Sequence, residues 1–128
     1  MNNFLQDIAE FHKKFNYHQS NNAVVNNDEL MRFRINFIQE ELDELKDAVI
    51  RNNSADALDA LVDLTYIILG TAWLYNLPFA AAWKAVHEAN MKKVRGKSDR
   101  SETYDCVKPN GWLAPDIHKI LMEGQTYD

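Results

Sequence analysis

The sequence has one cysteine, no excess of basic residues and no long apolar run at its start. Cys106 has no partner for an internal disulfide, which favours a reducing compartment such as the cytoplasm. Lysine and arginine number 14 against 19 aspartate and glutamate residues, for a formal net charge of -5. A general nucleic-acid binder would show a basic patch, so we expect no nucleic-acid partner.

Signals for export or membrane insertion are also missing. The opening stretch MNNFLQDIAEFHKK is amphipathic and lacks the apolar centre of a signal peptide. The most apolar stretch, residues 57–77, contains Asp59 and Asp63 and ends before Pro78. We therefore expect a buried core helix there and no membrane partner.

Apolar residues recur with helical spacing along most of the chain, and no internal repeat or strand-like alternation stands out. The pattern predicts a first helix over about residues 3–15 and a second helix that begins after a cap at Asn27 or Asp28 and ends at the RNNS turn. A third helix is predicted over 55–75, with Ser54 as its cap, and a fourth over 78–93. A short helix over 115–122 is predicted to follow an irregular tail. We expect a single all-α domain over residues 1–128 with an antiparallel four-helix bundle core.

The predicted second helix carries carboxylates on its apolar side. At about 100° per residue, Glu41 lies near the centre of the apolar arc, Glu44 lies on the same side, and Glu40 lies at its edge. An ionised carboxylate that faces a core is costly unless something compensates its charge. The simplest alternative is a solvated acidic face, and a second is a buried ion pair with Arg34.

The predicted third helix repeats this pattern. Asp56, Asp59 and Asp63 are three and four residues apart, so they form one acidic stripe on an otherwise apolar helix. Because the turn between the two helices is short, they must be antiparallel neighbours, and their acidic stripes can face each other. A hard divalent cation such as Mg²⁺, bound by carboxylates, would relieve the repulsion. Zinc is not expected, because the sequence contains no CxxC or HxxxH motif.

A basic segment follows near the end of the fourth predicted helix. His87, Asn90 and Lys93 are spaced three apart, and we expect Asn90 to face inward and, with Lys93, to contact phosphate. Lys92 and Arg95 are equally well explained as complements of the helix dipole. The remaining histidines have no companions at meaningful spacing and are interpreted as surface residues: His12, His18 and His118.

Five segments, in order, resemble one known family. They are DIAEFHKKF, RINFIQEELDEL, DALVDLTYIILGTAW, AVHEANMKK and VKPNGWLAPDIHKIL. Together they are similar to the all-α nucleoside triphosphate pyrophosphatases, the MazG-like and phosphoribosyl-ATP pyrophosphohydrolase-like superfamily, and most of all to small stand-alone members of the phage type. The EELDE motif followed by an acidic pair looks like that family's EExxE…ExxD signature.

The resemblance implies roles for individual residues. Glu41, Glu44 and Asp63 match magnesium ligands, while the glutamate position of ExxD is Ala60 here, so Asp59 would have to supply that carboxylate. Asn90 and Lys93 match residues that approach the triphosphate. The implied catalytic residues are Glu40, Glu41 and Lys93, with Glu40 orienting or deprotonating the water. Together with His87, which the spacing alone places beside them, the expected substrate-binding residues are Arg34, Asn90 and Lys93.

The resemblance also implies an activity. The chain is expected to hydrolyse nucleoside triphosphates, with purine deoxynucleotides slightly favoured, at the α–β bond to a monophosphate and pyrophosphate. Mg²⁺ is the expected cofactor, Mn²⁺ is a possible substitute, and a homodimer or homotetramer in the cytoplasm of a bacterium or phage-infected host is expected. Two alternatives stay open at this point: hydrolysis of phosphoribosyl-ATP, and a non-catalytic helical interaction module of the same fold.

Overall fold

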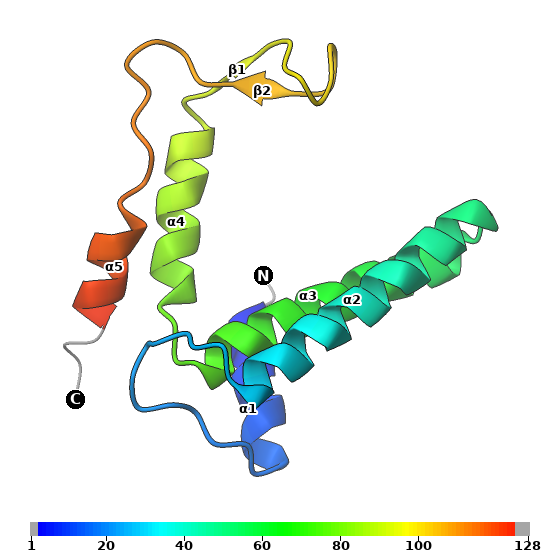
Figure 1. Ribbon diagram of the computed structural model, residues 1–128, viewed down its shortest axis with the longest axis vertical. Coiled ribbons are helices and arrows are strands. Elements are labelled where there is room, and N and C mark those ends of the chain that lie inside the picture. Colours follow the sequence, from blue (N-terminus) through cyan, green and yellow to red (C-terminus); the bar gives the residue numbers. More distant parts are fainter. Residues whose placement is uncertain (1–2, 125–128) are drawn as a thin grey trace. The chain divides into compact units, whose positions relative to one another are not determined.

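The computed structural model describes residues 3–124, and the chain divides into two compact units, residues 1–77 and 78–128. The first unit contains α1 (Phe4–Lys14), α2 (Glu29–Ile50) and α3 (Ser54–Leu74). Helices α2 and α3 form a long antiparallel hairpin, and α1 packs on α3 (Figure 1). Each unit is described by itself below.

Short polar side chains set where the helices of the first unit begin. The side chains of Asn3, Asp28 and Asn53 accept hydrogen bonds from backbone N–H groups in the first turns of α1, α2 and α3. The tight turn between α2 and α3 includes Asn52 at a φ of 54°, a conformation that asparagine tolerates better than most residues. The predicted cap of α3 was Ser54, but Asn53 occupies that position.

The core of the first unit lies where α3 meets α1 and α2. Ile8, Ala48, Ala60, Ile67 and Leu74 are buried there. The prediction that the third helix is central agrees with its packing against both other helices. One face of α3 nevertheless stays open, with Leu58, Leu61 and Val62 at least half exposed. By length and composition alone α3 could also cross a membrane, which is weak evidence, and the absence of a membrane partner stays a prediction.

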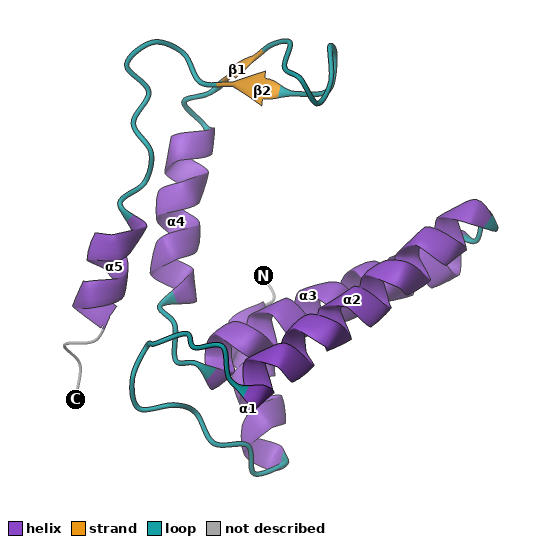
Figure 2. Cartoon of the chain, in the orientation of Figure 1, coloured by secondary structure: helices purple, strands orange, loops and turns teal. Residues whose placement is uncertain are grey.

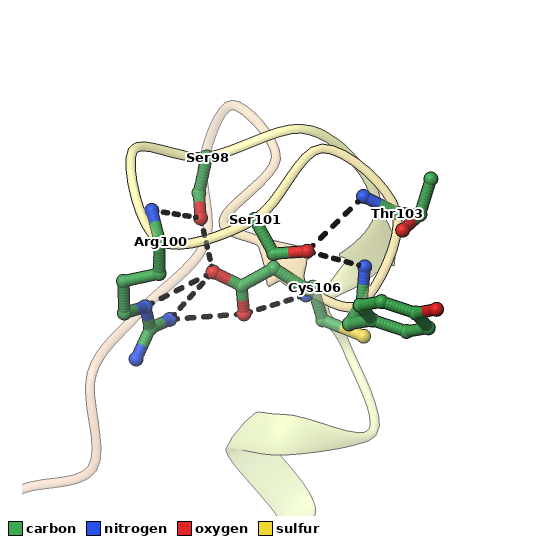
Figure 3. Close-up of polar contacts among 7 residues, drawn as sticks. Ser98, Arg100, Ser101, Thr103 and Cys106 are labelled. Atoms are coloured by element: carbon green, nitrogen blue, oxygen red, sulfur yellow. Dashed lines mark hydrogen bonds and ion pairs between the residues drawn. The ribbon is translucent and has the colours of Figure 1, made fainter.

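The second unit contains α4 (Phe79–Asn90), β1 (Val94–Arg95), β2 (Cys106–Val107) and α5 (Ile117–Gly124). Helix α5 packs on α4, and the two short strands pair antiparallel with Val94 opposite Val107 (Figure 2). The loop between the strands is held by the carboxylate of Asp105, which accepts hydrogen bonds from Ser98 and Arg100 (Figure 3).

The predicted all-α class, the largely irregular tail and the short terminal helix are confirmed. Three of the four helices expected in the core pack together in the first unit, whereas α4 belongs to the second. Helix α4 also ends at Asn90, three residues before the predicted end, because the chain turns there toward β1. The tail also contains a hairpin of two strands with two residues each, which the pattern of apolar and polar residues did not predict. A single domain over residues 1–128 stays a prediction, and its ends lie outside the described residues.

Candidate active site

The α2–α3 hairpin brings together one predicted carboxylate from each of its two helices. Glu41 on α2 and Asp63 on α3 line one pocket of about 260 Å³. Three aromatic or imidazole rings of α1 and α3 also line it, from Phe11, His12 and Tyr66. The antiparallel packing predicted from the short turn is the cause of this juxtaposition, because it sets the inner face of α2 against that of α3.

The carboxylate of Glu41 is the least satisfied polar group of the pocket. Its Oε2 atom is buried and has no hydrogen-bond partner among the described residues. Burial, and after it the neighbouring carboxylates of Glu44, Asp63 and Asp59 in that order, together raise the pKa of Glu41 to about 7. An ionised Glu41 therefore destabilises the protein unless a positive charge approaches it.

Asp63 shows the same effect from the facing helix. Burial raises the pKa of Asp63, and the charges of Asp59 and then Glu44 add to the rise. Both helices thus present a half-buried carboxylate to the same pocket, and the charges of Glu44 and Asp59 raise the pKa of both carboxylates. Structural ion-pair networks can perturb a pKa as well, but here burial is the largest cause for both groups, and every neighbour that adds to the rise is another carboxylate.

Glu44 and Asp59 lie on the outer side of this cluster. Both are exposed and line a hollow of about 520 Å³ toward the hairpin turn. At the far end of that hollow, Arg51 forms ion pairs with Asp47 at 2.8 Å and with Asp56 at 3.0 Å. Asp56, the first member of the predicted stripe, is thereby neutralised. The carboxylate cluster is therefore partly buried on the side of Glu41 and Asp63 and exposed on the side of Glu44 and Asp59.

The donor set suits a hard cation. Glu41, Glu44, Asp59 and Asp63 supply only carboxylate oxygens, and one of these oxygens is buried without a partner. Within residues 3–124, however, no three acidic, histidine or cysteine side chains converge closely enough to hold a metal ion as they stand. Repelling carboxylates have no reason to converge without a cation, so binding would require their side chains to turn inward.

Arg34 lines the same pocket but does not neutralise Glu41. It is 7% exposed, its Nε donates to Thr71 Oγ1 at 3.0 Å, and one terminal nitrogen donates to the Ile67 carbonyl at 2.9 Å. Burial lowers the pKa of Arg34. In the described part of the chain no ion pair joins Arg34 to Glu41 or to Glu40. The alternative explanation of Glu41 as half of an ion pair is therefore not supported. Glu40 itself is exposed on α2.

The predicted phosphate ligands lie in the second unit. His87 and Asn90 are exposed on α4, so the expectation that Asn90 faces inward is wrong: the buried position of that turn is Ala89. Lys93 is half-buried, and its Nζ lies 5.4 Å from the centre of the Trp112 ring. Whether these three residues share a site with the carboxylates stays a prediction.

One residue near the site escaped sequence analysis. His12, interpreted as a surface residue, is 2% exposed. Its Nδ1 lies 2.8 Å from the Ile8 carbonyl, and its ring stacks on Trp73 with 4.8 Å between ring centres. The signal was present in the sequence, because His12 follows Ile8 by four residues and so lies on the apolar face of α1.

Comparisons with known proteins identify the family of this chain. Residues 8–90 match the family described as phosphoribosyl-ATP pyrophosphohydrolase, a span that covers both helices of the carboxylate cluster. The chain is 31% identical over 115 residues to an uncharacterized protein of Acanthamoeba polyphaga mimivirus, covering 80% of this chain but 45% of that protein. The chain thus spans less than half of that viral relative. By its match over most of its length, the chain belongs to the phosphoribosyl-ATP pyrophosphohydrolase family, whose activity is of the nucleotide pyrophosphohydrolase type.

Proposed function

We propose that this protein hydrolyses nucleoside triphosphates at the α–β bond, releasing a nucleoside monophosphate and pyrophosphate. The observation that carries the proposal is the carboxylate of Glu41, whose Oε2 atom is buried without a hydrogen-bond partner and which lies near three further carboxylates. The chain that contains this carboxylate belongs to a pyrophosphohydrolase family. A site of this kind is unfavourable for folding, and it becomes useful once a cation is present.

Mg²⁺ is the cofactor we propose, with Mn²⁺ as a substitute, held by Glu41, Glu44, Asp59 and Asp63. When bound, such an ion stabilises negative charge on phosphate oxygens and lowers the pKa of a coordinated water. The exposed carboxylate of Glu40 is proposed to orient the attacking water and accept its proton. Lys93 and Asn90, with His87, are proposed to contact the phosphates.

The pocket beside Glu41 is proposed to receive the nucleoside. Phe11, Phe37 and Tyr66 contribute aromatic faces on which a base can stack, and Arg34 contributes a fixed cation. The pocket is largely preformed, because α1, α2 and α3 all contribute to its walls. This arrangement supports a nucleotide substrate, and we retain the preference for purine deoxynucleotides as a proposal only.

A second candidate substrate is phosphoribosyl-ATP, because the matched family bears that name. Both substrates contain an α–β bond next to an adenosine or similar nucleoside, so the carboxylate cluster alone does not separate them. A panel decides between them: pyrophosphate release is measured with phosphoribosyl-ATP and with ribo- and deoxynucleoside triphosphates, each with Mg²⁺, Mn²⁺ or EDTA. If no substrate of the panel releases pyrophosphate, the hydrolase proposal is excluded, and the alternative of a non-catalytic helical interaction module is left.

A homodimer or homotetramer is also proposed. The exposed apolar face of α3 supports self-association, since Leu58, Leu61 and Val62 are 63%, 50% and 54% exposed. Part of this face lines a second apolar pocket of about 260 Å³ together with Phe4 of α1. Light scattering measures the mass in solution. Leu61→Asp is expected to yield monomers, whereas a wild-type protein that is monomeric at all concentrations would contradict the proposal.

The activity assay needs a matched carboxylate control. Asp43 lies on the same helix as Glu41, is exposed, and accepts a hydrogen bond from Gln39. Asp43→Asn removes one charge without touching the proposed ligands, so it is expected to retain most of the turnover. Glu41→Gln is expected to abolish turnover. Equal activity of the two variants would contradict the assignment of Glu41.

A further inference from the structure

Two lysines of the second unit lie opposite each other across the small hairpin. Val94 of β1 pairs with Val107 of β2 in antiparallel register, so the next position of that register places Lys93 opposite Lys108. Like charges directly opposite in an antiparallel pair destabilise it. The chain nevertheless keeps a lysine on both sides.

The ammonium groups of both lysines lie over the ring of Trp112. The Nζ of Lys93 lies 5.4 Å from the centre of the Trp112 ring, and the Nζ of Lys108 lies 5.0 Å from the same point. Cation–π attraction to an indole offsets part of the repulsion between the lysines. Both positive charges thus lie within 5.4 Å of the centre of the Trp112 ring.

Trp112 itself is fixed by two hydrogen bonds. Its ring Nε1 donates to the Ala89 carbonyl at 2.7 Å, in the last turn of α4. Its backbone N–H donates to the Pro109 carbonyl at 3.0 Å, which closes a turn whose third residue, Gly111, has a φ of 81°. Glycine adopts that conformation at little cost, so the PNGW sequence favours this turn. The ring is therefore positioned before any ligand arrives.

The two lysines have no acidic partner among residues 3–124. Two carboxylates of the hairpin, those of Asp105 and Glu102, are engaged elsewhere. Asp105 pairs with Arg100 and also accepts a hydrogen bond from Ser98 (Figure 3). Glu102 pairs with Lys97 at 3.1 Å. The positive charge at Trp112 is thus left for an external anion.

We propose that Lys93 and Lys108, positioned by Trp112, form a binding site for a polyphosphate group. Two ammonium groups held close to one ring match adjacent phosphoryl groups better than they match a singly charged anion. The proposed function involves Lys93 only; this inference adds Lys108 as a binding residue and Trp112 as a positioning residue. It does not depend on hydrolysis at Glu41.

The direct test is titration of the full-length protein with inorganic pyrophosphate in EDTA, followed by calorimetry. Without divalent metal the carboxylate cluster has no means of attracting this anion, so the signal reports the lysine pair. Lys108→Met and Lys93→Met are each expected to weaken pyrophosphate binding about tenfold, the effect of losing one charge-assisted contact. Lys84→Met, which removes an exposed charge of α4, is the matched control and is expected to bind as the wild type does.

The thermal readout gives an independent check. Pyrophosphate should raise the melting temperature of the wild type and of Lys84→Met, but not that of a Lys93→Met/Lys108→Met double variant. Without ligand, Lys108→Met is expected to melt at or above the wild-type temperature, because the like-charge pair is gone. Pyrophosphate binding by the double variant that equals that of Lys84→Met would overturn the proposal.

Trp112 is tested by a pair of substitutions. Trp112→Leu removes the ring that gathers the ammonium groups and is expected to weaken pyrophosphate binding as either lysine variant does. Trp112→Phe keeps an aromatic face and is expected to restore most of the binding, although it loses the hydrogen bond to Ala89. If Trp112→Leu melts too low to titrate, the two lysine variants still decide the matter.

Two further measurements distinguish the two natural sources of the polyphosphate group, which are the nucleotide substrate and free pyrophosphate. If the site takes the phosphate chain of the nucleotide substrate, Lys108→Met raises the KM for hydrolysis and weakens binding of an α,β-methylene nucleotide analogue in EDTA. If it takes free pyrophosphate, Lys108→Met leaves KM unchanged and weakens product inhibition. Glu41→Gln is expected to bind pyrophosphate normally in EDTA, so a failed hydrolysis assay would not count against this site.

Discussion

The hydroxyl of Tyr75 donates a hydrogen bond of 2.5 Å to Oδ1 of Asp28, the residue that caps α2. This contact joins the end of α3 to the start of α2, at the end of the hairpin far from its turn. Tyr75 is 5% exposed. Burial, and then the bond to Asp28, raises the pKa of Tyr75 to about 12, and the same bond is the main reason that the pKa of Asp28 is lowered. The facing of Glu41 and Asp63 depends on this alignment of the two helices.

Tyr75→Phe is expected to lower the melting temperature by roughly 3–6 °C, the effect of losing about one hydrogen bond in a domain of this size. Because the folded-state pKa of Asp28 lies below its ordinary value of 3.8, this contribution is present above that pH and is lost as the pH falls further. The difference between the variant and the wild type should therefore shrink in acid. A constant difference down to acid denaturation would argue against the bond to Asp28.

Glu41→Gln is expected to abolish turnover and to remove the rise in melting temperature that Mg²⁺ gives the wild type. The physical reason is that the amide neither attracts a cation nor repels Glu44 and Asp63. In EDTA the same variant should be at least as stable as the wild type. Calorimetry with and without Mg²⁺ measures both effects, and Asp43→Asn serves as the control. A Mg²⁺-dependent stabilisation that survives in Glu41→Gln would exclude this carboxylate as a ligand.

The stability of the metal-free protein should fall as the pH rises from about 4.5 to about 7. Glu41 ionises at its ordinary value of 4.5 in the unfolded chain but at about 7 in the folded chain, so the folded state binds more protons across that interval. Asp63 acts in the same direction. Urea titrations at several pH values in EDTA measure the slope. Glu41→Gln should flatten it, and an unchanged slope in the variant would refute the assignment.

Gly70→Ala is expected to destabilise the first unit. A Cβ atom at this position would lie 2.8 Å from a terminal nitrogen of Arg34 and 3.0 Å from Cε1 of His12. Overpacking of this kind costs about 1–3 kcal/mol, more than the roughly 1 kcal/mol gained by replacing glycine in a helix. The displaced terminal nitrogen would lose its bond to the Ile67 carbonyl, and the shifted guanidinium would alter the nucleoside pocket, so KM should rise as well.

A double-mutant cycle separates these causes. If the clash with Arg34 dominates, the effects of Gly70→Ala and Arg34→Met on the free energy of unfolding should be less than additive. Strict additivity would show that the added methyl group acts through His12 or through the backbone instead. Denaturant unfolding of the four proteins supplies the required values.

Much of the first unit is visible in local sequence pattern. The apolar spacing, the short polar caps and the tight RNNS turn together predict α1, α2 and α3 to within about two residues of their observed ends. The position of Glu41 on the apolar arc of α2 follows from the 100° step alone. These features are local, since each depends on residues within a turn or two of one another.

Other features depend on contacts between distant residues. Arg34 was a plausible partner for Glu41, but it is already satisfied by Thr71 and the Ile67 carbonyl of the facing helix. Asp56 was grouped with Asp59, but Arg51 neutralises it. Neither outcome follows from the spacing of residues along one helix, because both depend on which side chains lie within bonding distance of each other in the folded chain.

The sequence by itself determined the helical class, the ends of α1, α2 and α3 to within about two residues, and the presence of carboxylates on two inward faces, because periodicity and capping act over a few residues. Only the tertiary structure decided that Glu41 and Asp63 share an inner pocket while Glu44 and Asp59 stay exposed, and that Lys108 lies opposite Lys93 at Trp112. The reason is that neighbours across helices and strands are fixed by packing and by register, which no single segment specifies.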